Sequence, residues 1–224
     1  MKFGGTSLAA ADARSRVADH IARERRCGHD VVVVVSAMGR LGDPYATDTL
    51  IEWINEQGGK LPQREMDLLL SCGELISAAT LCSTLLARDI PSAVLTGGQA
   101  GIETDDQYGQ ARIVHVRPNR ILELLQQGKV VIVTGFQGQT ASGETTTLGR
   151  GGSDTTATAL GYALHADWVD IYTDVDGILT ADPKYVQDAK RLPVISYGEI
   201  CNMAYHGAKV IHPREVEIAM QAQI

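Results

Sequence analysis

Hydrophobic positions along this chain form short aliphatic runs that alternate with longer amphipathic stretches. Residues 31–35 are all valine, which is typical of a parallel strand buried on both faces of a sheet. Similar runs predict strands at residues 93–95, 130–134 and 169–173. Helical spacing predicts helices at residues 9–26, 48–56, 65–88, 118–126, 153–164 and 214–222. This alternation predicts an α/β fold in one domain, a three-layer αβα sandwich with a mostly parallel central sheet.

Composition narrows the class of protein further. The 224 residues are 44% hydrophobic but only 5% aromatic, which fits an aliphatic α/β core. A net charge of −7 argues against nucleic acid or an anionic membrane surface as a partner. No apolar run is expected to reach the length of a membrane helix, and no signal peptide opens the sequence. The four cysteines form no CxxC pair, so we expect reduced thiols and a cytoplasmic location.

The segment TTTLGRGGSD, residues 145–154, carries the strongest chemical signal in the sequence. Its threonines lead into a glycine-rich turn with Arg150, and a helix is expected to follow with Ser153 as N-cap and Asp154 in its first turn. Such a junction points backbone N–H groups and a helix dipole at one spot, which favours an anion. A second glycine-rich segment, KFGGTS at residues 2–7, also carries a cation, Lys2.

Polar segments follow the predicted strands at residues 36–39, 96–98, 134–136 and 173–177, where ligands of open α/β sheets bind. The sequence has no GxxxxGK[ST] loop, no HRD or DFG triplet, no GxGxxG fingerprint and no GxSxG elbow. His206 and His212 are expected at a surface or interface rather than on a metal. Two glycine-rich anion sites with lysines fit phosphoryl transfer, which depends on positioning and charge neutralisation.

Six motifs, in this order, resemble those of the aspartate kinase family, within the amino-acid kinase superfamily. They are KFGGTS (2–7), VVVSAMG (33–39), SCGELIS (71–77), TTTLGRGGSD (145–154), YTDVDGILTADP (172–183) and GAKVIHP (207–213). Residues 39–50, GRLGDPYATDTL, are most similar to the Bacillus type that is sensitive to diaminopimelate. The resemblance implies the amino-acid kinase fold and the ATP-dependent phosphorylation of the side-chain carboxylate of L-aspartate to 4-phospho-L-aspartate. That reaction is the first step towards diaminopimelate and lysine, threonine and methionine.

The resemblance also implies roles for single residues in catalysis. Lys2 would lie between the γ-phosphate and the attacking carboxylate and offset their repulsion. Gly4 and Gly5 would bring backbone N–H groups to the phosphates, and Lys209 would neutralise phosphate charge from the other side. Asp154 completes the catalytic set. A carboxylate is already ionised at neutral pH, so the nucleophile needs no general base.

The same resemblance predicts how the substrate is held. Arg150 would bind the α-carboxylate with its planar fork, and Glu74 and Asp154 would both hold the α-ammonium. Ser36 and Thr47 would donate hydrogen bonds near the side-chain carboxylate. From the residues alone, Glu74 fits the exposed side of a long helix and Thr47 fits an ordinary helix N-cap. The resemblance favours the binding role for Glu74 instead.

The nucleotide is expected over residues 173–184, with Thr173 and Asp174 near adenine and ribose. Leu179 and Lys184 stand where many family members carry tyrosine and arginine, so an aromatic contact and a bidentate fork are lost. The full predicted ATP-binding set is Lys2, Phe3, Gly4, Gly5, Thr173, Asp174, Leu179, Lys184, Lys209 and Val210. Mg²⁺ is expected to bridge the β- and γ-phosphates without a protein ligand.

Relative to the family pattern, only Met1 precedes KFGG, and the sequence ends at Ile224. We therefore expect residues 1–224 to be a catalytic domain truncated at both ends, without the first strand and the C-terminal ACT regulatory domains. A homo-oligomer, a dimer, is expected. A glutamate or N-acetylglutamate kinase remains an alternative, although Glu74 with Asp154 favours a substrate with a free α-ammonium. A catalytically silent nucleotide- or amino-acid-binding module is the other alternative.

Overall fold

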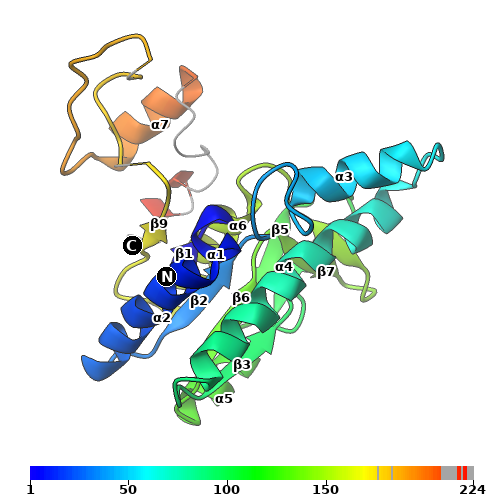
Figure 1. Cartoon of the computed structure of the whole chain (residues 1–224), viewed down its shortest axis with the longest axis horizontal. Coiled ribbons are helices and arrows are strands. Elements are labelled where there is room, and N and C mark those ends of the chain that lie inside the picture. Colours follow the sequence, from blue (N-terminus) through cyan, green and yellow to red (C-terminus); the bar gives the residue numbers. More distant parts are fainter. Residues whose placement is uncertain (176, 183, 208–215, 218, 221–224) are drawn as a thin grey trace.

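The computed structural model describes residues 1–175, 177–182, 184–207, 216–217 and 219–220. Its centre is a sheet of five parallel strands in the order β3–β6–β2–β1–β9 (Figure 1). The strands are β1 (Lys2–Phe3), β2 (Val32–Val35), β3 (Ser92–Leu95), β6 (Val130–Thr134) and β9 (Ile171–Tyr172). Val35 is in register with Phe3 on one side and Thr134 on the other. The carboxyl ends of the three central strands therefore lie level.

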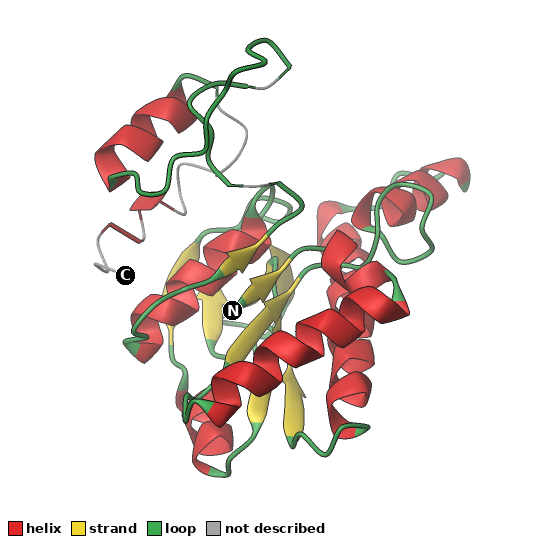
Figure 2. Ribbon diagram, turned by 60° about the vertical axis from the view of Figure 1, so that its left-hand side comes forward, coloured by secondary structure: helices red, strands yellow, loops and turns green. Residues whose placement is uncertain are grey.

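Side chains of the central strands alternate between two apolar layers, which confirms the predicted αβα sandwich. Val33 and Val35 face the layer that contains Leu81, whereas Val34 faces the opposite layer with Leu160. Helices α1 (Thr6–Ala9), α2 (Ala11–Arg26) and α4 (Gln63–Leu86) cover the first face. Helices α5 (Asn119–Gln126) and α6 (Gly152–Leu164) cover the second face (Figure 2).

The KFGG segment itself begins with a strand, β1, and the expected truncation at both ends stays a prediction. Strand β1 has only two residues, yet it lies between β2 and β9 and pairs with both. The Met1 amino group donates to Val32 O at 2.8 Å, and Val34 N donates to Met1 O at 2.9 Å. Burial disfavours the charged form of that amino group and lowers its pKa to about 6. The sheet is therefore continuous across β1.

A second sheet, which the hydrophobic pattern did not predict, packs beside the first. Its order is β5–β4–β7–β8. The strands are β4 (Ile102–Thr104), β5 (Ile113–Val116), β7 (Gln137–Thr140) and β8 (Thr145–Thr147). The threonines before the glycine-rich turn are thus a strand, β8. Strands β7 and β8 are rich in threonine, glutamine and glycine and give a weak apolar signal, and β4 and β5 have only three and four residues.

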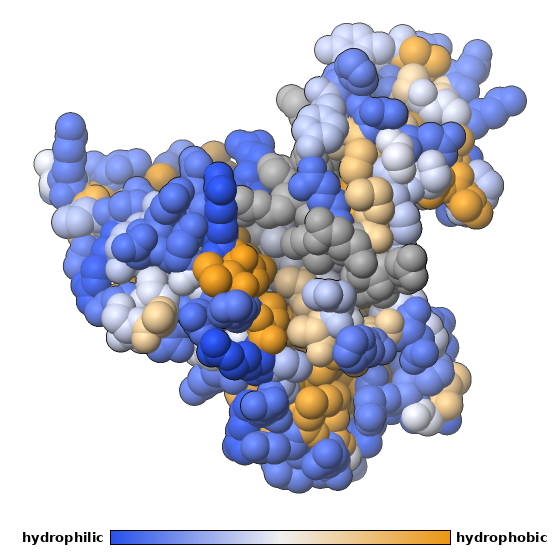
Figure 3. Space-filling model, turned by 180° about the vertical axis from the view of Figure 1, so that it is seen from behind, coloured by the Kyte–Doolittle hydropathy of each residue, from blue (hydrophilic) through white to orange (hydrophobic). Residues whose placement is uncertain are grey.

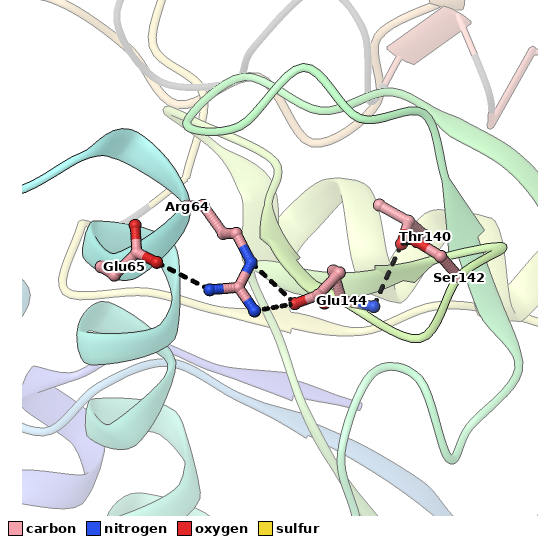
Figure 4. A network of polar contacts seen from close by, with 5 residues as sticks. All are labelled: Arg64, Glu65, Thr140, Ser142 and Glu144. Atoms are coloured by element: carbon pink, nitrogen blue, oxygen red, sulfur yellow. Dashed lines mark hydrogen bonds and ion pairs between the residues drawn. The ribbon is translucent and has the colours of Figure 1, made fainter.

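Helix α4 is tied to this second sheet by polar contacts at its amino-terminal end. The buried Asp67 carboxylate accepts hydrogen bonds from Thr147 N at 2.8 Å, Thr147 Oγ1 at 2.9 Å and Gly109 N at 2.9 Å. At the surface, Arg64 binds Glu144 of the β7–β8 hairpin and its own neighbour Glu65 (Figure 4). The helix thus fixes the small sheet against the large one.

Helix α4 is 24 residues long and apolar enough, by length and composition, to cross a membrane. The expectation that no apolar run approaches that length is therefore wrong. In this fold the helix packs against the sheet, with Ala78, Leu81 and Leu85 fully buried and two carboxylates, Asp67 and Glu74, also buried. Its apolar character is that of a core helix.

The surface of the molecule, seen from behind, is mostly hydrophilic, with a few apolar patches (Figure 3).

Other element boundaries also differ from the predicted ones. The helix predicted at residues 9–26 corresponds to α2, and Ala10, where ψ is 151°, separates it from α1. Helix α6 begins at Gly152 with Gly151 as N-cap, so Ser153 is not the cap. Helix α3 (Thr47–Glu56) is close to its prediction. Helix α7 (Tyr197–Tyr205) was not predicted; it projects from the main body (Figure 1). Most of the helix predicted at 214–222 lies outside the described residues.

Candidate functional site

A cavity of about 340 Å³ opens at the carboxyl ends of β1 and β2 and the start of α6. It lies where an open α/β sheet is expected to bind ligands. Seven of the predicted site residues line it, namely Lys2, Gly5, Ser36, Thr47, Glu74, Arg150 and Asp154. They come from separate segments of the sequence, so the fold brings together the residues that the motifs single out.

Lys2 and Asp154 form an ion pair in this cavity. Lys2 Nζ lies 2.6 Å from Asp154 Oδ1, and the two side chains are 10% and 24% exposed. The contact is electrostatic, since Asp154 Oδ1 accepts no well-directed hydrogen bond within the described part of the chain. Asp154 lies in the first turn of α6, where the helix dipole favours a negative charge. The pair links the two glycine-rich segments of the sequence.

Glu74 is buried at the base of the cavity, so the exposed-helix interpretation is wrong. Glu74 is only 2% exposed. Oε1 accepts a hydrogen bond from Ala37 N at 3.1 Å, while Oε2 has no partner among the described residues. Burial disfavours the ionised form and raises the pKa of this carboxyl to about 8. A cationic group entering the cavity would stabilise its charge.

The glycine-rich loop before α6 forms one wall of the cavity. Gly149 and Gly151 have φ of 76° and 74°, a left-handed conformation that other residues rarely adopt. A Cβ on Gly152 would lie 2.9 Å from Phe136 Cδ2, so this position also requires glycine. Arg150 is exposed between these glycines and lines the cavity. The loop therefore presents a guanidinium beside the first N–H groups of α6.

Two hydroxyl residues line the opposite wall. Ser36 follows β2, where its N–H donates to Phe3 O at 3.2 Å, and its side chain is half-buried. Thr47 is the first residue of α3, and the N-cap is Ala46, so the N-cap interpretation of Thr47 is wrong. Both residues line the cavity, and their role in substrate binding stays a prediction.

The KFGG segment has a packing role that the motif alone did not indicate. A Cβ on Gly5 would lie 2.3 Å from Ala37 O, so Gly5 is required where β1 and β2 end side by side. Phe3 is 1% exposed and stacks on Tyr172 with ring centroids 4.5 Å apart. Its side chain is part of the core, and the predicted contact of Phe3 with ATP stays a prediction. Gly4 has more room, because a Cβ there would lie 3.9 Å from Tyr172 O.

The residues predicted to bind the nucleotide base lie away from this cavity. Thr173, Asp174, Leu179 and Lys184 do not line it, although Asp174 pairs with Arg40, which does. Leu179 forms an isolated bridge with Arg191, and Lys184 is exposed. Lys209, Val210 and His212 lie outside the described residues. The nucleotide half of the site therefore stays a prediction.

Sequence reasoning gave no role to two cavity residues, Arg40 and Asp48, whereas Phe136 belongs to the segment 134–136 that was expected near a ligand. Arg40 and Phe136 follow the ends of β2 and β6, so their position after a strand was the available signal. By contrast, residues 96–98 do not line the cavity. A Cβ on Gly97 would lie 2.0 Å from Gln137 O, so that turn serves the packing of β7.

A second cavity, of about 390 Å³, lies at the opposite, amino-terminal edge of the sheet. Its floor is apolar, with Val32, Leu125 and Leu160. Of the predicted site residues that the structure describes, none lines it. The smaller cavity is the better candidate site, because convergent charges and an unpartnered buried carboxylate are concentrated there.

Comparison with known proteins agrees with the fold and with the predicted resemblance to aspartate kinases. Aspartokinase 1 of Bacillus subtilis is 53% identical over 223 residues, covering 100% of this chain and 55% of that protein. The crystal structure of aspartate kinase from Synechocystis has a TM-score of 0.84 and 44% identity, covering 100% of this chain and 36% of that chain. E. coli aspartokinase III in complex with aspartate and ADP has a TM-score of 0.83 and 32% identity, covering 99% of this chain and 59% of that one.

The chain spans about half the length of the curated relatives it matches. Residues 1–224 match the amino acid kinase family over their whole length. The parallel sheet, the cavity at its carboxyl edge and the glycine-rich loops agree with that match. The chain belongs to the amino acid kinase family.

Proposed function

We propose that residues 1–224 form the catalytic domain of an aspartate kinase, which transfers the γ-phosphoryl group of ATP to the side-chain carboxylate of L-aspartate. The observation that carries this proposal is the cavity in which the Lys2–Asp154 ion pair and the buried Glu74 carboxylate face the loop with Arg150. In the full-length protein, ACT regulatory domains would follow this domain. A dimeric assembly and a cytoplasmic location belong to the same proposal.

The charges that line the cavity complement an amino acid with two carboxylates and one ammonium. Arg150 would bind the α-carboxylate through two parallel N–H donors. Glu74 would receive the α-ammonium, which offsets the burial of its own charge. Asp154 would face the same ammonium, and Ser36 and Thr47 would bind near the side-chain carboxylate. A substrate without a free ammonium would leave Glu74 unpaired.

The chemistry requires two anions to meet. An oxygen of the aspartate side-chain carboxylate forms a bond to the γ-phosphorus, and the bond from that phosphorus to the β,γ-bridging oxygen breaks. The products are 4-phospho-L-aspartate and ADP. Lys2 would offset the repulsion between the attacking carboxylate and the phosphate, and Lys209 would add positive charge. Asp154 would orient Lys2 through their ion pair.

The nucleotide would enter beside this cavity, with its phosphates at Lys2, Gly4 and Gly5. Its base would lie towards Thr173 and Asp174, near Leu179 and Lys184. Among the described residues, no group of three or more His, Cys, Asp or Glu side chains could hold a metal ion. Mg²⁺ would be held by phosphate oxygens and water, because it prefers oxygen ligands and keeps several waters, and it would neutralise phosphate charge when bound with ATP.

The test is a panel of candidate substrates. ADP release is measured with aspartate, glutamate and N-acetylglutamate, and the acyl phosphate is trapped as a hydroxamate. Turnover with aspartate, and little or none with N-acetylglutamate, is the expected result. Comparable turnover with glutamate would broaden the substrate class, and no turnover with any of them would contradict the proposed function.

A further inference from the structure

Two buried hydroxyl groups behind Glu74 have no hydrogen-bond partner among the described residues. The atoms are Ser77 Oγ and Thr134 Oγ1, and Glu74 Oε2 is in the same state. Ser77 and Thr134 are both 0% exposed. A buried polar group without a partner costs free energy, so it usually has a partner or a function. Neither hydroxyl is explained by the packing of the core.

The fold places these two hydroxyls at the same height between α4 and β6. Residues 87–91 connect Leu86, at the end of α4, to Ser92, at the start of β3. Ser92 pairs with Val130, so the carboxyl end of α4 lies near the start of β6. Ser77 precedes Leu86 by nine residues, about 13–14 Å along a helix. Thr134 follows Val130 by four residues, about 13 Å along a strand. The distance along α4 to Ser77 and the distance along β6 to Thr134 agree, so the two residues lie at a similar height.

Both hydroxyls also face the same layer. Val130 and Ile132 pack in the cluster with Ala78 and Leu81 of α4, and Thr134 follows them on the same side of the strand. Ser77 lies next to Ala78 on the buried face of α4, one turn from Glu74. Both hydroxyls therefore lie in the layer between α4 and the sheet, and Ser77 is three residues from Glu74 on the helix.

Ser77 differs from other hydroxyl residues of its own helix. Thr80 Oγ1 donates to Ile76 O at 2.8 Å, and Thr84 Oγ1 donates to Thr80 O at 3.0 Å. These bonds to the preceding turn satisfy a hydroxyl inside a helix. Ser77 Oγ makes no such bond among the described residues, so it remains available to a group outside the helix backbone.

We propose that Ser77 and Thr134 are positioning residues, whose hydroxyls hold Glu74 Oε2 through buried water at the base of the substrate cavity. The inference rests on the proposed role of Glu74 in binding the substrate ammonium. Buried water commonly bridges polar groups that do not meet directly. The hydroxyls donate towards the carboxylate and stabilise its ionised form. The charged groups that face the same cavity are Lys2, Arg40, Asp48, Arg150 and Asp154.

Variants that remove one hydroxyl test this positioning. Thr134→Val keeps the β-branched shape, and Ser77→Ala removes only the hydroxyl. Each should raise the KM for aspartate roughly three- to tenfold, with the KM for ATP changed less than twofold. Thr134→Ser and Ser77→Thr should restore most of the affinity. A purely structural role predicts an unchanged KM and a higher Tm, since an unpartnered hydroxyl has gone, and this result would overturn the proposal.

A substrate-free measurement separates this inference from the proposed function. The Glu74 carboxyl is titrated by ¹³C NMR in the unliganded 224-residue chain and in each variant. Loss of a hydroxyl should raise its pKa by about half a unit or more, which corresponds to a threefold change in proton affinity. An unchanged Glu74 pKa in both variants would overturn the positioning even if aspartate is phosphorylated. A raised pKa without aspartate turnover would support the positioning and contradict the proposed function.

Discussion

Lys2 Nζ and Asp154 Oδ1 lie 2.6 Å apart, where the end of β1 meets the first turn of α6. This contact joins the two glycine-rich segments into one site. Lys2 is 8% exposed, so its ammonium is held in a fixed place near the cavity instead of moving freely in solvent. A charge that is positioned before the substrates arrive requires little reorganisation during the reaction.

Lys2→Ala should therefore lower turnover far more than affinity. The positive charge matters most when the γ-phosphate and the carboxylate approach each other in the transition state. We expect kcat to fall roughly a hundredfold or more, with smaller changes in the KM values for ATP and aspartate. Steady-state kinetics would measure this, with the exposed Lys60→Ala as control. An effect confined to the KM values would contradict the catalytic role.

Arg150→Lys should weaken aspartate binding selectively. Lysine keeps the charge but loses the bidentate fork that matches a carboxylate. We expect the KM for aspartate to rise roughly tenfold or more, while the KM for ATP changes little. Arg112→Lys, at another exposed arginine that does not line the cavity, is the matched control. Equal losses for aspartate and ATP would show that Arg150 serves the nucleotide as well.

Gly5→Ala should destabilise the fold as well as lower activity. The added Cβ would lie 2.3 Å from Ala37 O and 2.9 Å from Gly39 O, both of which are backbone atoms. The backbone must move, and a cost of about 1–3 kcal/mol is typical of such overpacking. Thermal unfolding measures it. Gly59→Ala is the control, because nothing lies within 4 Å of a Cβ there. A stable but inactive Gly5→Ala would assign Gly5 to phosphate binding alone.

Asp67→Asn should separate the second sheet from α4. Four hydrogen bonds converge on the buried carboxylate, two at Oδ2 from the backbone N–H groups of Gly109 and Thr147 and two at Oδ1 from Thr147 Oγ1 and Gln63 Nε2. An amide replaces one acceptor oxygen with a donor, so either the two backbone N–H groups or the two side-chain donors lose their acceptor. A loss of roughly 2–4 kcal/mol in the free energy of unfolding is expected. Denaturant unfolding measures it, and the exposed Asp106→Asn should be neutral.

The sequence pattern predicted the parallel layers well because their strands are short and continuously apolar. Val31 to Val35 and Val130 to Thr134 are the clearest cases, and the structure has β2 and β6 there. The second sheet was missed because β7 and β8 carry glutamine, glycine and threonine, whose burial depends on tertiary pairing with α4 and β4. Strand β1 was missed because two residues are too few to form a pattern.

The candidate site was predicted by its motifs more than by any local propensity. Arg150 lies between two glycines and Lys2 lies two residues before Gly4, so both were predicted to lie near a bound anion. Glu74 was different, because the residues alone favoured an exposed helix face. Its burial follows from packing against Ala37, a partner far away in the sequence. No local pattern contains that contact, and only the resemblance to a family pointed to it.

Glu74→Gln should make the unliganded protein more stable at alkaline pH while it abolishes aspartate binding. Burial raises the pKa of Glu74 from 4.5 to about 8, so the folded state disfavours the ionised side chain. Below pH 4.5 the group is protonated in both the folded and unfolded states, and it costs nothing. As the pH rises towards 8, the unfolded state ionises first, and the free energy of unfolding falls by roughly 3–5 kcal/mol.

The glutamine of Glu74→Gln stays neutral and can still accept from Ala37 N, so this loss of stability should disappear in the variant. Denaturant unfolding at about pH 4 and about pH 9, on either side of the transition, would compare both proteins, with the exposed Glu123→Gln as control. An equal pH dependence in the Glu74→Gln variant and in the parent would mean that Glu74 does not carry the raised pKa.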